Sequence, residues 1–133
     1  SSFAFLYEIN IEGFEGEQTS FLCSHKLASS RKKYFCKDPC NKDEDILARV
    51  EPGGRTVKGR LSLKDFGDGV FSVTFNPLQL SDTHLYYCAV ERLVSTMQTF
   101  LSINPKQKHI KHHTTRGFYA HISNFCFLFL TLT

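Results

Sequence analysis

Alternation of apolar and polar residues with a period of two recurs along the chain from residue 3 to residue 103. Such alternation is typical of strands that bury one face, and the alternating stretches are separated by turn-forming residues such as Gly, Pro and Asp. The strands predicted from this pattern cover residues 3–11, 19–24, 33–37, 71–75, 86–90 and 99–103. We therefore expect an all-β fold in which two sheets pack face to face.

The stretch 81–88, Ser-Asp-Thr-His-Leu-Tyr-Tyr-Cys, is the most informative of these. Tyr86 and Cys88 are two residues apart, so on a strand both side chains point to one face while Tyr87 points to the other. If that face is the core, Cys88 is buried and available to a partner cysteine. Tyr86 then buries its ring and turns its hydroxyl to the backbone of the preceding turn, as in the tyrosine corner of immunoglobulin sandwiches.

These residues resemble a V-set immunoglobulin domain, a β-sandwich of two antiparallel sheets with Greek-key connections. The resemblance implies a disulfide between Cys88 and a cysteine about 65 residues upstream, where Cys23 stands. It also places Phe35 where these domains pack a large aromatic residue on the disulfide; that residue is normally Trp, and the chain has no Trp. Arg60 and Asp82 stand where V-set domains have an ion pair that closes the bottom of the sandwich.

A second disulfide is predicted from the direction of the side chains on residues 33–37. Because Phe35 faces the core, Tyr34 and Cys36 turn to the outer face, and Cys36 cannot reach the buried cysteines. Cys40 lies just after a turn signal, Asp-Pro, so we predict a local Cys36–Cys40 bridge, with two free thiols as the alternative. In the chain-entropy model the Cys23–Cys88 disulfide, which closes a long loop, stabilises the fold by about 4 kcal/mol, and the Cys36–Cys40 disulfide, which closes a short one, by about 2 kcal/mol.

The run Lys-Tyr-Phe-Cys-Lys at 33–37, followed by a further cysteine, narrows the family. It resembles the "KYWC" strand of the polymeric immunoglobulin receptor and its CMRF-like myeloid relatives, and the resemblance covers about residues 8–94. Members of that group bind immunoglobulin polymers or the phospholipid headgroups of membranes. The resemblance therefore implies the ligand-binding ectodomain of an immune receptor that takes part in signal transduction.

Composition and charge restrict the location and the partners. The 133 residues carry a formal charge of +3, which permits anionic partners but lacks the dense basic character of a nucleic-acid binder. Five cysteines in so short a chain favour an oxidising compartment. We expect the extracellular side of the plasma membrane, with secretion as the alternative, and a leader peptide that has been removed.

We expect residues 1–105 to form the V-set domain and residues 106–133 to form a basic linker with a short apolar tail. His109, His112 and His113 lie in the linker without a cysteine or carboxylate at ligand spacing, so no zinc site is predicted. The apolar segment 125–132 is far shorter than the roughly 20 residues that span a bilayer. It is interpreted as a truncated membrane segment, a non-native end or an added edge strand, and Cys126 is left without a partner.

Recognition is expected from the loops at residues 25–31, 38–44 and 91–97, held by rigid strands. The predicted cluster of Arg31, Lys32, Lys33 and Lys37 suits phosphate or carboxylate groups, although solvated cations at a strand edge also discourage aggregation. The candidate ligand-binding residues are His25, Lys26, Arg31, Lys37, Asp38, Glu91, Arg92, Leu93 and Val94.

The acidic residues 43–45, with Asp38, are interpreted as a charged turn in preference to a calcium site, which needs six or more oxygen ligands. No catalytic motif is recognised, so we expect neither an enzyme nor a cofactor or metal. The predicted partner is a protein, immunoglobulin first, or an anionic phospholipid headgroup. Two alternatives stay open: a homophilic adhesion domain that associates through the outer face around Tyr34 and Tyr87, and a secreted decoy receptor.

Overall fold

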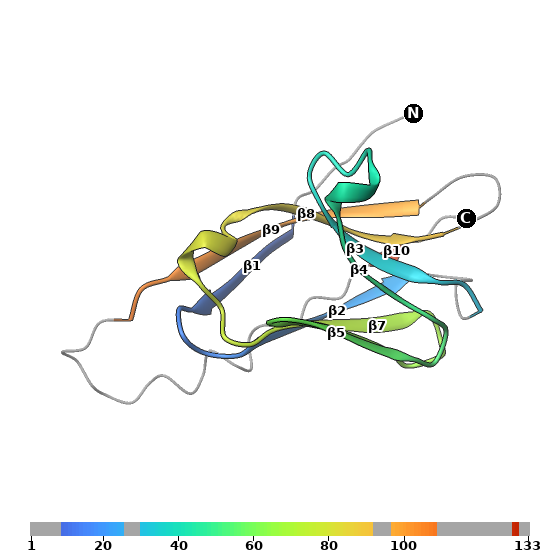
Figure 1. The fold of residues 1–133 in the computed structure, drawn as a ribbon, viewed down its shortest axis with the longest axis horizontal. Coiled ribbons are helices and arrows are strands. Elements are labelled where there is room, and N and C mark those ends of the chain that lie inside the picture. The colour runs from blue at the N-terminus through green and yellow to red at the C-terminus, as the bar shows by residue number, and fades with distance from the viewer. Residues whose placement is uncertain (1–8, 26–29, 92–96, 109–128, 131–133) are drawn as a thin grey trace.

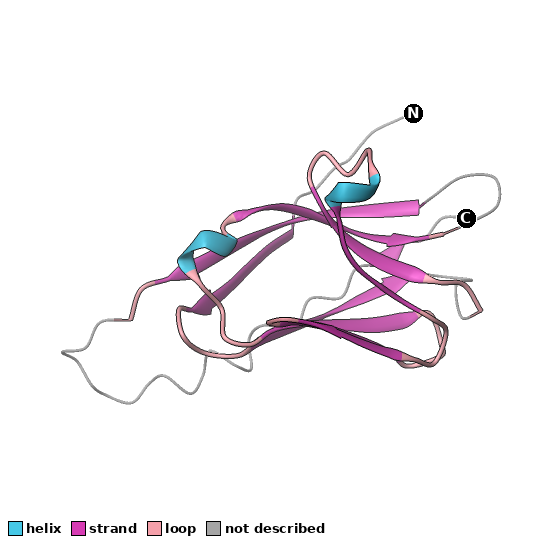
Figure 2. Ribbon diagram, viewed as in Figure 1, coloured by secondary structure: helices cyan, strands magenta, loops and turns pink. Residues whose placement is uncertain are grey.

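The computed structural model describes residues 9–25, 30–91, 97–108 and 129–130. In that part of the chain two five-stranded sheets pack against each other as a sandwich (Figure 1, Figure 2). The first sheet has the spatial order β1 (Ile9–Phe14), β9 (Met97–Lys106), β8 (His84–Val90), β3 (Lys33–Lys37), β4 (Ile46–Val50). The second has the order β10 (Phe129–Leu130), β2 (Thr19–His25), β7 (Val70–Phe75), β6 (Leu61–Asp65), β5 (Arg55–Lys58). Short 3-10 turns, η1 (Asp43–Asp45) and η2 (Leu80–Asp82), precede β4 and β8.

Strand pairing follows the expected sandwich with two differences at the edges. The inner pairs of both sheets are antiparallel, whereas β1 runs parallel to β9 and β10 runs parallel to β2. Strand β5 has no counterpart among the predicted strands, and it forms a hairpin with β6. As a result β4 and β5 end up as edge strands of opposite sheets.

The core confirms the predicted direction of the side chains on each strand. Every second residue of β2, β6 and β7 is buried, and these residues meet β3 and β8 across the sandwich. Phe35 is fully buried and stacks on Tyr86, with ring centroids 5.0 Å apart. Cys23 and Cys88 are bonded, and Cys88 is the register neighbour of Phe35. A phenylalanine thus fills the position in which V-set domains usually carry Trp.

His25 is the last residue of β2, and its side chain is buried. Its ring Nε2 lies 3.2 Å from the Thr99 hydroxyl oxygen of β9, within hydrogen-bonding distance. The prediction that His25 belongs to a ligand-binding loop is therefore wrong. Strand β2 continues one residue further than expected, and its alternation turns this side chain to the interior.

The C-terminal segment contributes one described strand, in which Phe129 pairs with Ser24 and Leu130 pairs with His25. This corresponds to the edge-strand interpretation of the tail. The division into residues 1–105 and 106–133 stays a prediction, and the three linker histidines and Cys126 lie outside the described residues. Among the residues described, none of the helices is long and apolar enough to cross a membrane.

Candidate functional site

The turn between β3 and β4 is held against the outer face of the first sheet. The predicted Cys36–Cys40 disulfide is present and brings the two Cα atoms to 5.6 Å. Tyr34, Cys36 and Ala89 form a small buried cluster on this face, and Cys40 packs against it together with Ile46 and Tyr87. The disulfide therefore constrains the conformation of the turn, and the side of the turn that faces the sheet is apolar.

Polar contacts fix the same turn to β8 and β9. The Tyr87 hydroxyl donates to Asp38 Oδ1 at 2.9 Å, and the Gln98 amide nitrogen lies 3.4 Å from Cys40 Sγ. Burial raises the pKa of Tyr87, and its hydrogen bond to Asp38 adds to that shift. Tyr34 is only 8% exposed beneath the turn. On the face that was the expected surface for homophilic association, Tyr34 is thus buried, and Tyr87 is half-buried and hydrogen-bonded to the turn.

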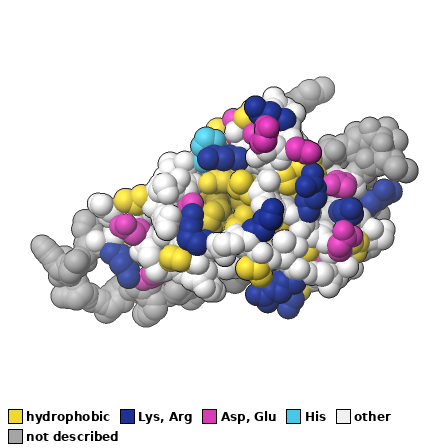
Figure 3. Space-filling model, viewed as in Figure 1, with side chains coloured by type: hydrophobic (Ala, Val, Ile, Leu, Met, Phe, Trp, Pro, Cys, Tyr) yellow, Lys and Arg dark blue, Asp and Glu magenta, His cyan; other side chains and the backbone are white. Residues whose placement is uncertain are grey.

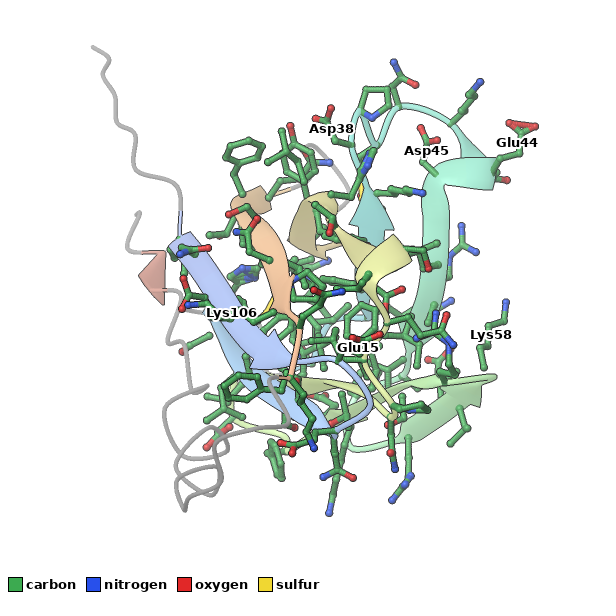
Figure 4. The ribbon with its side chains drawn as sticks, turned by 90° about the vertical axis from the view of Figure 1, so that its left-hand side faces the viewer. Glu15, Asp38, Glu44, Asp45, Lys58 and Lys106 are labelled. Atoms are coloured by element: carbon green, nitrogen blue, oxygen red, sulfur yellow. A yellow bond between two sulfur atoms is a disulfide. The ribbon has the colours of Figure 1, made fainter. Side chains whose placement is uncertain are left out.

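The carboxylates of the turn have partners close by. Asp45 accepts a hydrogen bond from the Asn41 backbone N–H at 3.0 Å, and Asp43 lies 3.3 Å from the Arg49 guanidinium. Figure 4 shows Asp38, Asp45 and Glu44 spread around this turn. In the described ranges, no group of three or more His, Cys, Asp or Glu side chains is arranged to hold a metal ion.

Lys33 does not belong to a surface cluster. Its side chain is fully buried, and its Nζ lies 3.0 Å from Asp65 Oδ2 at the end of β6. The same oxygen also accepts the Gly53 backbone N–H at 2.8 Å. Lys33 shares the inward face of β3 with Phe35, because the two residues are one strand period apart. A buried ion pair thus links the two sheets.

Of the remaining cations in the predicted cluster, Lys37 is separated from Arg31 and Lys32. Lys32 lies 3.6 Å from Glu51, and Arg31 is exposed just before β3. Lys37 is exposed at the other end of β3, and the steps from one end of this strand to the other, at about 3.3 Å each, put roughly 13 Å between the ends. The prediction of a single basic cluster is therefore wrong.

Glu91 follows β8 at the same end of the sandwich as Arg31. Its backbone N–H donates to the Lys32 carbonyl at 2.9 Å, and its carboxylate lies 3.6 Å from Arg49 Nε. The predicted ligand-binding residues Lys26, Arg92, Leu93 and Val94 lie outside the described residues. The structure thus places Arg31 and Glu91 at one end of the first sheet, with Lys37 and Asp38 beyond the far end of β3. A ligand-binding role for any of them stays a prediction.

The bottom of the sandwich is closed by Arg60 and Asp82. Two nearly parallel hydrogen bonds of 2.8 and 2.9 Å join the guanidinium to the carboxylate, and the Gln79 backbone N–H donates to the same carboxylate. Burial opposes ionisation of Asp82, but the hydrogen bonds from Arg60 and Gln79 outweigh it, so the pKa lies below its ordinary value. The Tyr86 hydroxyl donates to the Asp82 carbonyl at 2.6 Å, which forms the tyrosine corner, and burial raises the pKa of Tyr86 to about 12.

This ion pair predicts a loss of stability in acid. Because the pKa of Asp82 is lowered on folding, its contribution is fully present above the unfolded value of about 3.9 and is lost as the pH falls through the folded pKa. We expect the free energy of unfolding to decline below about pH 4 in the native protein, and to decline less in an Asp82→Asn variant. Urea unfolding over a pH series measures this. Glu44→Gln, which removes an exposed carboxylate beside Lys42, is the control, and the same acid dependence in all three proteins would contradict the prediction.

Comparisons with known proteins agree with this fold. The family model "Immunoglobulin V-set domain" matches residues 8–110. The chain is 31% identical over 87 residues to human CMRF35-like molecule 9, which covers 62% of the chain and 26% of the relative. It is 33% identical over 63 residues to mouse CMRF35-like molecule 3, which covers 46% of the chain and 26% of the relative. The chain thus spans about a quarter of the length of these curated relatives.

Solved structures share the sandwich at low sequence identity. Human T-cell immunoglobulin and mucin domain protein 1 superposes with a TM-score of 0.65 at 18% identity, over 75% of this chain and 99% of that one. The ectodomain of the teleost fish polymeric Ig receptor gives a TM-score of 0.59 at 19% identity, over 77% of this chain and 47% of that one. These similarities confirm the predicted fold class.

Proposed function

The chain belongs to the immunoglobulin V-set family, and from this premise we propose that it is the ligand-binding ectodomain of a cell-surface immune receptor. The observation that carries the proposal is the β3–β4 turn, which the Cys36–Cys40 disulfide and the Tyr87–Asp38 hydrogen bond hold against the outer sheet face. A turn fixed in this way loses little conformational entropy when it binds a partner. The similarity of the chain to CMRF35-like molecules supports an immune role. The two disulfides support a location on the extracellular side of the plasma membrane.

A protein is the favoured ligand, with polymeric immunoglobulin first. The fish polymeric Ig receptor is named for that ligand and shares the fold. The separation of the cations weakens the case for anionic phospholipid, because Lys33 is buried and Lys37 lies at the far end of β3 from Arg31. Recognition is proposed to use the turn at 38–44 together with the loops that flank Arg31 and Glu91.

Binding assays with two ligands test the proposal. Polymeric immunoglobulin is immobilised on a sensor surface, and vesicles of phosphatidylcholine, with or without phosphatidylserine, are offered with a salt series and with or without calcium. We expect the purified domain to bind polymeric immunoglobulin, and we expect Arg31→Ala and Asp38→Asn to weaken that binding. Salt-sensitive binding to anionic vesicles alone would replace the protein ligand with a lipid headgroup. Binding to neither ligand would contradict the proposal.

The homophilic alternative is tested by light scattering. A mass that stays at one chain across the concentration range removes this alternative. A concentration-dependent mass would support it and would require a surface other than the one that the β3–β4 turn covers.

A further inference from the structure

An open cleft of about 250 Å³ lies at the bottom of the sandwich, away from the loops next to Arg31 and Glu91. It opens between the edge strands β4 and β5 and reaches η2 and the last residue of β7. Figure 3 shows hydrophobic side chains exposed in the middle of this face, with Lys and Arg side chains around them. The residues that line the cleft are Lys37, Leu47, Lys58, Arg60, Leu61, Phe75, Ser81, Asp82 and Tyr86.

The floor of the cleft is apolar and belongs to the core. Leu61, Phe75 and Tyr86 are all buried there and pack in the main hydrophobic cluster. Leu47 joins them because the pairing of β3 with β4 shifts register at this point: Phe35 pairs with Ala48, but Cys36 pairs with Ile46. The extra residue turns Leu47 toward the core side, as β-bulges commonly re-aim a side chain.

The rim of the cleft carries a surplus of positive charge. Three cations line it against one carboxylate, and Arg60 is already paired with Asp82 by two hydrogen bonds. Lys37 and Lys58 are exposed, and in the described part of the chain no carboxylate lies within 4.0 Å of either ammonium group. Burial raises the pKa of Asp82, but the hydrogen bonds from Arg60 and Gln79 lower it more, and the nearby charges of Arg60 and Lys37 lower it further.

An apolar floor beneath two unpaired ammonium groups is complementary to an anion that carries a hydrocarbon group. We propose that this cleft binds a small amphipathic carboxylate, such as a medium-chain fatty acid, with its alkyl group on Leu47 and Phe75 and its carboxylate between Lys37 and Lys58. The volume lies just below the roughly 300–1,000 Å³ of sites for drug-sized ligands, so a short chain fits and a whole phospholipid does not. Figure 4 shows Lys58 well away from Asp38, Glu44 and Asp45 of the β3–β4 turn.

Apart from Lys37, which directly precedes the β3–β4 turn, the residues that line this cleft lie outside the proposed recognition surface, and binding in the cleft does not depend on that surface. Octanoate, octylamine and octanol are titrated into the ¹⁵N-labelled domain, and amide shifts are followed by NMR. Octanoate should shift the amides of Leu61 and Ser81 but leave those of Arg31 and Glu91 in place. An affinity of about 1 mM is expected for a ligand of this size, weakened by added salt. Octylamine and octanol should bind at least about tenfold more weakly, because they lack the negative charge.

Two double variants distinguish octanoate binding in this cleft from nonspecific attraction to the positive surface charge. Lys37→Gln with Lys58→Gln should weaken octanoate binding at least about tenfold while leaving the fold intact, because both side chains are exposed. Lys42→Gln with Lys64→Gln removes the same charge from exposed positions outside the cleft and should leave the affinity unchanged. Equal binding of octylamine, equal loss in both double variants, or no shift at the cleft amides would overturn the proposal. Arg31→Ala should not affect octanoate binding, so failure of the proposed receptor function would be seen separately.

Discussion

Replacing Cys23 and Cys88 together with alanine is expected to destabilise the domain by about 4 kcal/mol or more. The bond closes a loop of 65 residues, and its loss gives the unfolded chain back that conformational freedom. Both cysteines are fully buried beside Phe35, so the lost sulfur atoms also leave space in the core. Since small domains have only about 5–15 kcal/mol of stability, we expect little folded protein to be secreted.

The second disulfide provides the matched control. Cys36→Ser with Cys40→Ser opens a loop that spans only four positions, and the expected cost is about 2 kcal/mol. Guanidinium unfolding of the purified proteins gives the two free energies. A larger loss from the short bridge than from the long one would contradict the assignment of Cys23–Cys88 as the bond that holds the sandwich together.

Lys33→Met is expected to destabilise the protein by about 3–5 kcal/mol, although it introduces an apolar side chain into a buried position. The substitution leaves the Asp65 carboxylate buried with only backbone N–H partners. The cost of an unpaired buried charge exceeds the gain from burying a methionine. Urea unfolding of the variant measures this difference.

A second substitution separates the buried charge from the lost packing of Lys33. Lys33→Met with Asp65→Asn removes both charges, while the asparagine oxygen can still accept the Gly53 N–H, so most of the stability should return. Lys32→Met is the control, because its partner Glu51 is 3.6 Å away and both side chains are largely exposed; a change below about 0.5 kcal/mol is expected. If the double variant were as unstable as Lys33→Met, the ion pair would not be the source of the loss.

The period of two along each strand predicts most of the interior of this sandwich. Phe35 and Cys88 on the central strands are buried as predicted, and Cys36 faces the opposite side and bonds to Cys40. These predictions succeed because alternation and burial have the same physical cause in a two-layer fold. The same rule places Lys33 on the inner face, two residues before Phe35. Charge alone suggested an exposed side chain, and the partner that makes its burial possible, Asp65, is 32 residues away.

Features that depend on contacts between distant strands could not be predicted from the sequence. The register shift that turns Leu47 toward the core depends on how β3 and β4 pair. A shift of one residue cannot be recognised from the sequence of a short apolar run. The pairing of β5 with β6 is likewise not revealed by the sequence of β5, which is mostly exposed and has no buried face. His25, buried at the end of β2, contacts Thr99, which is 74 residues later in the sequence.

The position of the β3–β4 turn is another such feature. The sequence indicated a local disulfide at this turn, but the direction in which it folds depends on Tyr87 and Gln98 of other strands. These contacts hold the turn against the outer face, where Cys40 packs on the cluster that contains Tyr34, and the turn is part of the proposed recognition surface.

The most direct test compares ligand binding by the native domain and by Cys36→Ser with Cys40→Ser, each first shown to be folded by near-UV circular dichroism. Sensor-surface binding to polymeric immunoglobulin is measured for both proteins under the same conditions. We expect the native domain to bind and the folded variant to bind at least about tenfold more weakly, because the released turn must be ordered again on binding. Equal binding by the two proteins would contradict the proposal that the disulfide-shaped turn recognises the ligand.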